Sequence, residues 1–70
     1  MEFMQAMLAI QKATIAAKAR TGDGHLGTRA EGGKLQIVRV VPKGNRGDCD
    51  VLPVSRYLPI SEAISALDAL

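Results

Sequence analysis

The residues that could carry chemistry lie in two short stretches, "GDGHLG" at 22–27 and "PKGNRGDCD" at 42–50. They contain the only histidine, His25, and the only cysteine, Cys49. An imidazole beside a thiol would make a nucleophile and base pair, but the two residues lie on different segments and no spacing specifies an orienting carboxylate. Two ligands are also too few for structural zinc. We predict no catalytic residue, no metal site, no cofactor and no enzyme activity.

The stretch at 42–50 also contains the triplet R-G-D at 46–48. Cell adhesion would need an extracellular setting, and nothing in the sequence indicates export. Asp48 and Asp50 offer two carboxylates, but the D-x-D-x-D-G spacing and the closing glutamate of a calcium loop are missing. Glycine and asparagine are the residues that tight turns need, so we interpret the stretch as a polar hairpin loop whose glycines and Asn45 take positive φ. A contact role for the loop stays open.

The stretch at 22–27 matches the pattern G-x-G-x-x-G letter for letter. In a dinucleotide-binding domain this pattern follows a strand and opens a helix. Here it follows a predicted helix and precedes a predicted strand, in a chain too short for such a domain. We interpret it as a helix stop followed by a turn.

Two helices and three strands are predicted to position these stretches. Residues 4–20 are rich in good helix formers and end before Gly22, a natural C-terminal cap. The pair Gly32 and Gly33 predicts a tight hairpin turn, and Pro53 predicts that the third strand lies at an edge or contains a bulge. The second helix is short and has Ser61 as its expected N-cap. The elements are expected at residues 4–20, 25–31, 34–41, 50–58 and about ten residues within 59–70.

This order predicts a single small α+β domain spanning residues 1–70. The expected fold is α-β-β-β-α, a three-stranded antiparallel sheet with two helices packed on one face. A core of this size supplies only about 3 to 5 kcal/mol of net stability. Self-association or partner binding is therefore the expected source of additional stability.

The hairpin turn predicts which side chains share a face of the sheet. It pairs Glu31 with Lys34 and places Leu26, Leu35 and Ile37 on one side. If Val41 lies opposite Val51, this side also gains Tyr57. The helices are then expected on the opposite side, which would hold Val38, Val40, Leu52 and Val54. Two alternatives remain: the helices cover both sides, or a bulge at Pro53 re-phases the third strand.

Composition indicates a globular chain with a mild charge. Nine basic and seven acidic residues give a net charge of +2, and 47% of residues are hydrophobic. Nucleic-acid binders usually show denser basic clusters. The start, Met1-Glu2-Phe3, lacks a basic leader, no apolar run could span a membrane, and one unpaired cysteine suits a reducing compartment. A cytoplasmic location is expected.

The element order resembles that of the double-stranded-RNA-binding domain, and "GDGHLG" is loosely similar to that family's Gly-Pro-x-His loop. The resemblance implies an RNA-binding function. That family grips phosphates with lysines at the start of its second helix, whereas here this helix begins Ser61-Glu62 with no lysine or arginine through Leu70. The resemblance is therefore one of topology alone.

These observations predict a small non-enzymatic module that binds and blocks or adapts another protein, for example as a phage-type inhibitor of a host defence or regulatory complex. A homodimer is expected. The expected partner-binding residues are Ile37, Arg39 and Tyr57 on the uncovered face, with Arg46 as a peripheral contact. The alternative is a nucleic-acid-binding domain, and a third possibility is a subunit of a larger assembly. Nucleic-acid binding would use Lys34, Arg39, Lys43 and Arg46.

Overall fold

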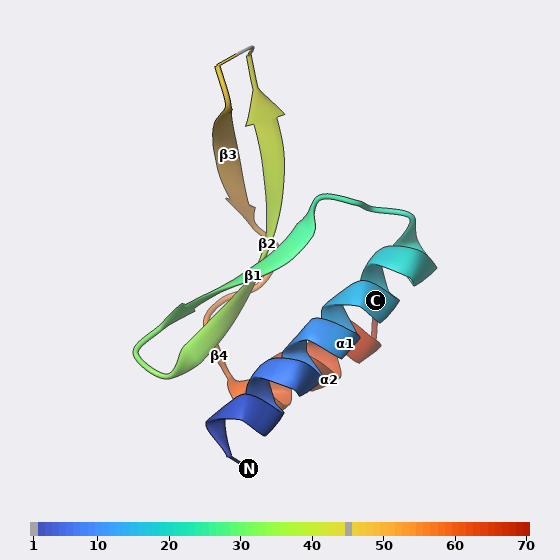
Figure 1. Cartoon of the computed structure of the whole chain (residues 1–70), viewed down its shortest axis with the longest axis vertical. Helices are drawn as coiled ribbons and strands as arrows, with labels where there is room; N and C mark the ends of the chain where they lie inside the picture. The colour runs from blue at the N-terminus through green and yellow to red at the C-terminus, as the bar shows by residue number, and fades with distance from the viewer. Residues whose placement is uncertain (1, 45) are drawn as a thin grey trace.

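The computed structural model describes residues 2–44 and 46–70 and confirms the predicted α-β-β-β-α order (Figure 1). A short fourth strand, which was not predicted, precedes the second helix. The elements are α1 (Phe3–Thr21), β1 (Leu26–Glu31), β2 (Lys34–Lys43), β3 (Asp48–Pro53), β4 (Leu58–Pro59) and α2 (Ile60–Asp68).

Helix α1 follows its alanine-rich sequence. Its buried positions recur every three or four residues, which places them on one side of the helix. Three of the four are alanines, so the neighbouring elements approach the helix closely. Gly22 ends the helix with φ 70°, and its N–H donates to the Lys18 carbonyl at 2.9 Å. The buried residues are Ala6, Ile10, Ala13 and Ala17.

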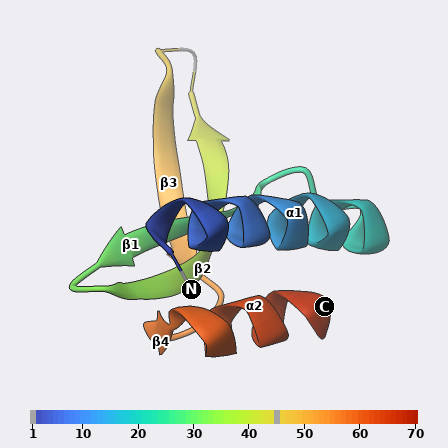
Figure 2. The ribbon, with the colours of Figure 1, turned by 60° about the horizontal axis from the view of Figure 1, so that its bottom comes forward.

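Helix α2 lies beside α1 and runs in the same direction (Figure 2). The Arg20 guanidinium joins the two C-terminal ends, because it donates to the carbonyls of Leu67 at 2.8 Å and Leu70 at 3.0 Å. A basic group there satisfies carbonyls that a helix end leaves unpaired. The N-cap prediction was wrong: Pro59, not Ser61, occupies that position, and no side chain caps the helix.

The first hairpin has the predicted register. Glu31 pairs with Lys34, Ala30 with Leu35 and Thr28 with Ile37, as a two-residue turn requires. Gly32 and Gly33 have φ angles of 59° and 76°. Residues with a Cβ adopt such angles only at a cost in conformational free energy. β2 lies at the centre of the sheet between β1 and β3.

The predicted register of the second hairpin was wrong by one residue. Val51 lies opposite Val40, and Val41 lies opposite Asp50. A slip of one residue moves every side chain of a strand to the other face. As Pro53 predicted, β3 is an edge strand. The predicted strand 50–58 is not continuous: the N–H groups of Val54 and Ser55 both donate to the Ile37 carbonyl, and pairing resumes at β4.

The helices cover the face of the sheet that the sequence interpretation left open. Leu26 and Ile37 pack with Ala13, Ala17 and Leu67 in one buried cluster. Leu35 packs in a second cluster with residues of both helices, Ile10 and Ala63. Two helices do pack on one face, as predicted, but the assignment of the faces was reversed. None of the described helices is both long and apolar enough to cross a bilayer.

The distal part of the β2–β3 hairpin projects from this body as a two-stranded arm (Figure 1). Every described residue of β3 is exposed, and the molecule measures 40 × 27 × 20 Å along its principal axes. Isolated two-stranded ribbons are marginally stable in water. Among the described helices and strands, β3 contacts β2 alone, so the helices do not support the arm.

Candidate functional site

The strand register gives the arm two chemically different faces. Residues that pair across an antiparallel ladder share a face, and faces alternate along each strand. One face continues the side of the sheet opposite the helices and holds no charged residue. We call it the apolar arm face, and it consists of Val38, Val40, Pro42, Cys49, Val51 and Pro53.

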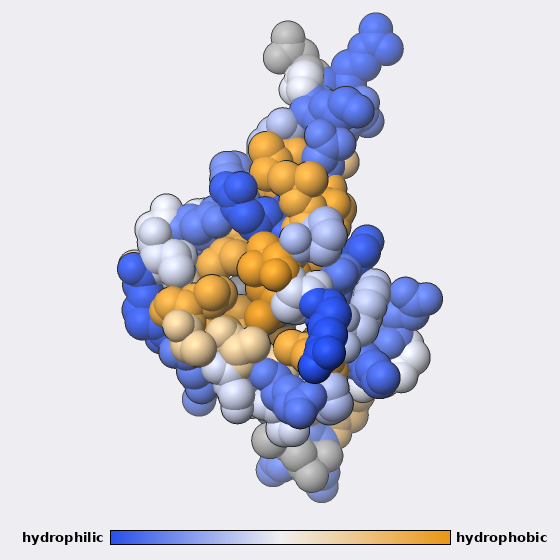
Figure 3. Space-filling model, turned by 180° about the vertical axis from the view of Figure 1, so that it is seen from behind, coloured by the Kyte–Doolittle hydropathy of each residue, from blue (hydrophilic) through white to orange (hydrophobic). Residues whose placement is uncertain are grey.

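Several aliphatic side chains around the arm are open to solvent. Val40 and Val51, paired on the apolar arm face, are 37% and 43% exposed. Val54 follows at the base of the arm and is also exposed, whereas Val38 is buried. Figure 3 shows hydrophobic residues that continue from the body onto the base of the arm, while the tip is hydrophilic. Exposed apolar surface rimmed by polar residues is typical of interaction sites.

The other face of the arm is mostly charged. The Lys43 ammonium lies 3.8 Å from the Asp50 carboxylate, and both side chains are exposed. Val41 and Leu52 are the apolar exceptions, and Leu52, which pairs with Arg39, is 46% exposed. The loop at the tip confirms the hairpin interpretation, with Gly44 and Gly47 at φ 72° and 76°. The expected positive φ of Asn45 lies outside the described residues.

The structure separates the four residues predicted to bind a partner. Ile37 is 2% exposed and belongs to the core, so its predicted place on an uncovered face was wrong. Arg39 shares that side of the sheet, while Tyr57 lies on the opposite side, because Leu58 after it pairs with Leu35. Arg46 is exposed in the loop at the tip of the arm. They do not form one site.

Arg39 is held by a specific partner. Its Nε donates to the Asp23 carboxylate at 2.7 Å, and Asp23 also accepts the backbone N–H of His25 at 3.0 Å. The hydrogen bond from Arg39, followed by the one from His25, lowers the pKa of Asp23 below its ordinary value of 3.8. The contact ties "GDGHLG" to the sheet, which supports the interpretation of that stretch as a structural turn.

Tyr57 belongs to a second polar cluster. The Arg29 guanidinium lies 5.8 Å from the centre of the Tyr57 ring, a favourable cation–π distance. Arg29 also donates to the side-chain carbonyl of Gln36 at 2.7 Å, and Gln36 is buried. These contacts give both side chains a structural role on the sheet face opposite the helices.

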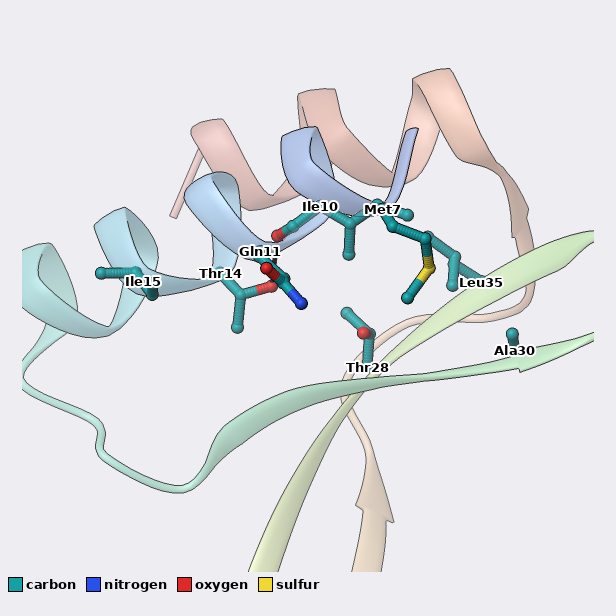
Figure 4. A pocket seen from close by; sticks show the side chains of 8 residues that line it. All are labelled: Met7, Ile10, Gln11, Thr14, Ile15, Thr28, Ala30 and Leu35. Carbon is teal, nitrogen blue, oxygen red and sulfur yellow. Dashed lines mark hydrogen bonds between the residues drawn. The ribbon is translucent and has the colours of Figure 1, made fainter. Parts of the chain in front are cut away.

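A groove of about 420 Å³ lies between α1 and β1. Figure 4 shows Met7, Gln11 and Thr14 directed from α1 toward β1, where Thr28 points back to the helix. None of the described lining residues is titratable, so the groove offers no group for acid–base catalysis. Its lining consists of Met7, Ile10, Gln11, Thr14, Ile15, Thr28, Ala30 and Leu35.

The outer side of α1 is a surface that the sequence interpretation missed. Exposed apolar residues extend from the groove around the helix to the side facing away from the body. All belong to one helix, and their spacing was visible in the sequence. At 100° per residue, one broad face of the helix holds five large apolar residues, and the structure buries only Ile10 among them. The exposed residues are Phe3, Met4, Met7, Leu8 and Ile15.

Comparisons with known proteins do not assign a function. No protein-family model, no curated protein and no solved structure matches the chain. Among the described residues, no three histidine, cysteine, aspartate or glutamate side chains come together as metal ligands. The two exposed apolar surfaces, the apolar arm face and the outer side of α1, are therefore the candidate functional sites.

Proposed function

We propose that this chain is a non-enzymatic protein-interaction module that acts as a homodimer and uses its arm to occupy an apolar cleft of another protein. The observation that carries the proposal is the apolar arm face, where Val40 and Val51 are exposed and no paired residue is charged. Burial of such a face lowers the free energy of the system. Its side chains carry no cationic group that could bind a phosphate. In this way the module would block or adapt its target.

The charges of the arm favour a protein over a nucleic acid as the partner. Of the basic residues that nucleic-acid binding would use, Arg39 is paired with Asp23 and Lys43 lies near Asp50. A two-stranded ribbon can enter the major groove of DNA. However, affinity for nucleic acid depends on uncompensated cations that neutralise phosphates.

The test compares two neighbouring residues of β3 with similar exposure. Val51→Asp places a carboxylate on the apolar arm face, and Leu52→Asp places one on the opposite face beside Arg39. The 70-residue chain is immobilised and used to capture proteins from a cell extract. A captured protein is then purified and titrated against each variant. We expect Val51→Asp to weaken binding at least tenfold and Leu52→Asp to leave it nearly unchanged.

Salt dependence separates the alternatives. Binding to an apolar cleft should change little between low and high salt. Binding that nuclease treatment removes, with a log-log salt slope of order minus one per phosphate, would instead favour the nucleic-acid function. Equal loss of binding in Val51→Asp and Leu52→Asp would contradict the assignment to the apolar arm face.

A further inference from the structure

Helix α1 has apolar residues on two opposite sides. Its buried residues face the sheet and α2, as expected for a surface helix. The opposite side of such a helix is normally polar. Here, Met4 is 73% exposed, Leu8 56% and Ile15 67%. Exposure of these side chains to water is unfavourable. It indicates that a second surface covers this side of the helix.

The spacing of these residues specifies what kind of surface fits. Met4, Leu8, Gln11 and Ile15 are separated by four, three and four residues. At 100° per residue, they fall within an arc of about 60° on the side of the helix away from its buried residues. One edge of this arc borders the groove beside β1, because Gln11 and Ile15 also line that groove. This alternation is the seam that packs against another helix in a coiled coil, and an occasional polar residue within a seam is common. We call these four residues the outer seam.

The exposed surface area of the chain is larger than expected for a monomer of its mass. A monomeric protein of 7.4 kDa is expected to expose about 4,200 Å², whereas this chain exposes 4901 Å². The excess of about 700 Å² is close to the area of about 800 Å² that each partner contributes to a standard interface. The projecting arm accounts for part of this excess, and the outer seam supplies an exposed, mostly apolar side of a helix.

The charges around the outer seam indicate the direction of the second helix. In a parallel pair, Lys18 would lie level with the same lysine of the other copy, and like charges at this distance repel. In an antiparallel pair centred between Leu8 and Gln11, Lys18 would lie near the N-terminal end of the other helix, where Glu2 is exposed. The antiparallel direction also aligns the two helix dipoles favourably.

We propose that two copies of this chain associate through the outer seam of α1, with the two helices antiparallel. This inference identifies the surface used for the self-association included in the proposed function. Isologous pairing of this kind closes a twofold dimer and leaves no seam exposed. Gln11 of each copy would lie opposite Leu8 of the other.

The first experiment measures the mass of the intact chain in solution by light scattering after size exclusion. We expect a salt-insensitive species of twice 7.4 kDa at micromolar concentration. Leu8→Glu and Ile15→Glu should each raise the dissociation constant at least 100-fold without loss of helical signal. The matched control is Gln5→Glu, which creates the same residue on an exposed side of α1 about 90° from the seam. A monomeric wild type, or a dimer that survives both seam variants, would overturn the inference.

A second experiment tests direction by disulfide formation in a Cys49→Ser background. In the antiparallel pair, Met4 lies level with the partner's Ile15, while the two Met4 residues are about 16 Å apart along the axis. Disulfides need Cα atoms within about 7 Å. A mixture of Met4→Cys and Ile15→Cys should give the mixed dimer on oxidation, and Met4→Cys alone should give none. Self-linkage of Met4→Cys would show a parallel pair.

Failure of this inference can be distinguished from failure of the proposed function. Capture through the arm is measured with Val51→Asp, which lies far from the seam in sequence and on the sheet face opposite the helices. A dimer whose arm captures no protein would contradict only the proposed partner binding. A monomer whose arm still binds its target would contradict only the outer-seam dimer.

Discussion

Ile37 gives the sharpest test of which sheet face is the core. The sequence interpretation placed it on an uncovered face, whereas the structure buries it between the helices at 2% exposure. Val51, which the same interpretation placed on that face, is 43% exposed. The same substitution at both positions, Ile37→Thr and Val51→Thr, should therefore have very different effects on the free energy of unfolding.

The expected magnitudes follow from burial. Ile37→Thr removes about one methylene from the core, worth about 0.8 kcal/mol, and buries a hydroxyl, which costs about 1 to 3 kcal/mol without a partner. The total loss is about 2 to 4 kcal/mol. Val51→Thr keeps the shape of a half-exposed side chain, so its effect should stay within about 0.5 kcal/mol.

Urea unfolding followed by circular dichroism measures both effects. A chain of this size has roughly 3 to 5 kcal/mol of stability, so a loss at the upper end for Ile37→Thr would leave too little folded protein for a native baseline. Ile37→Val, expected to cost about 1 kcal/mol, provides a measurable intermediate. All variants are compared at one protein concentration, because self-association adds to stability. Equal shifts for Ile37→Thr and Val51→Thr would refute the placement of Ile37 in the core.

Three further predictions test contacts that hold the turn, the helix ends and the hairpin. Asp23 has a lowered pKa in the folded state. Its contribution to stability is therefore full above pH 3.8 and is lost as the pH falls through the lowered pKa. Asp23→Asn should reduce the loss of stability at acid pH, and an unchanged loss would contradict this prediction. Arg20→Gln should destabilise the chain by about 1 to 3 kcal/mol through the lost charged hydrogen bonds to Leu67 and Leu70, seen as a lower urea midpoint. Gly33→Ala should cost about 1 kcal/mol from positive φ alone, since no atom obstructs a Cβ there, and a neutral result would argue against this turn.

Local signals in the sequence were sufficient for the two helices and the first hairpin. Gly22 stops α1 because it adopts positive φ, and Gly32 with Gly33 forms a turn whose length fixes the pairing of Glu31 with Lys34. Each of these inferences depends on residues next to one another in the chain. The structure accordingly confirms them without a shift of register.

The second hairpin could not be predicted in the same way. Its connection is a longer loop, so turn chemistry did not fix whether Val51 meets Val40 or Val41. Both faces of the sheet contain aliphatic residues, and the hydrophobic pattern therefore fitted either register. This one-residue ambiguity exchanged the faces of β3 and hid the apolar arm face. It also made Ile37 seem exposed and Tyr57 seem its neighbour.

The polar contacts were also beyond sequence reasoning. Arg39 and Tyr57 look like typical interface anchors, because arginine and tyrosine are enriched at hot spots. In the structure, Arg39 is occupied by Asp23, 16 residues away, and Tyr57 by Arg29. Only the three-dimensional arrangement shows that these side chains hold the fold together.

The two proposed surfaces lie on opposite sides of the sheet, and this has a functional consequence. A dimer formed through α1 leaves the apolar arm face of each copy free, so it presents two arms at once. Two linked arms bind a surface with several target molecules more tightly than one arm does, with no new contact. Leu8→Glu should therefore weaken retention on a densely coated target surface far more than it weakens binding to the same target in solution. If the two losses were equal, the seam would contribute to target contact itself, and the assignment of separate roles to α1 and the arm would fail.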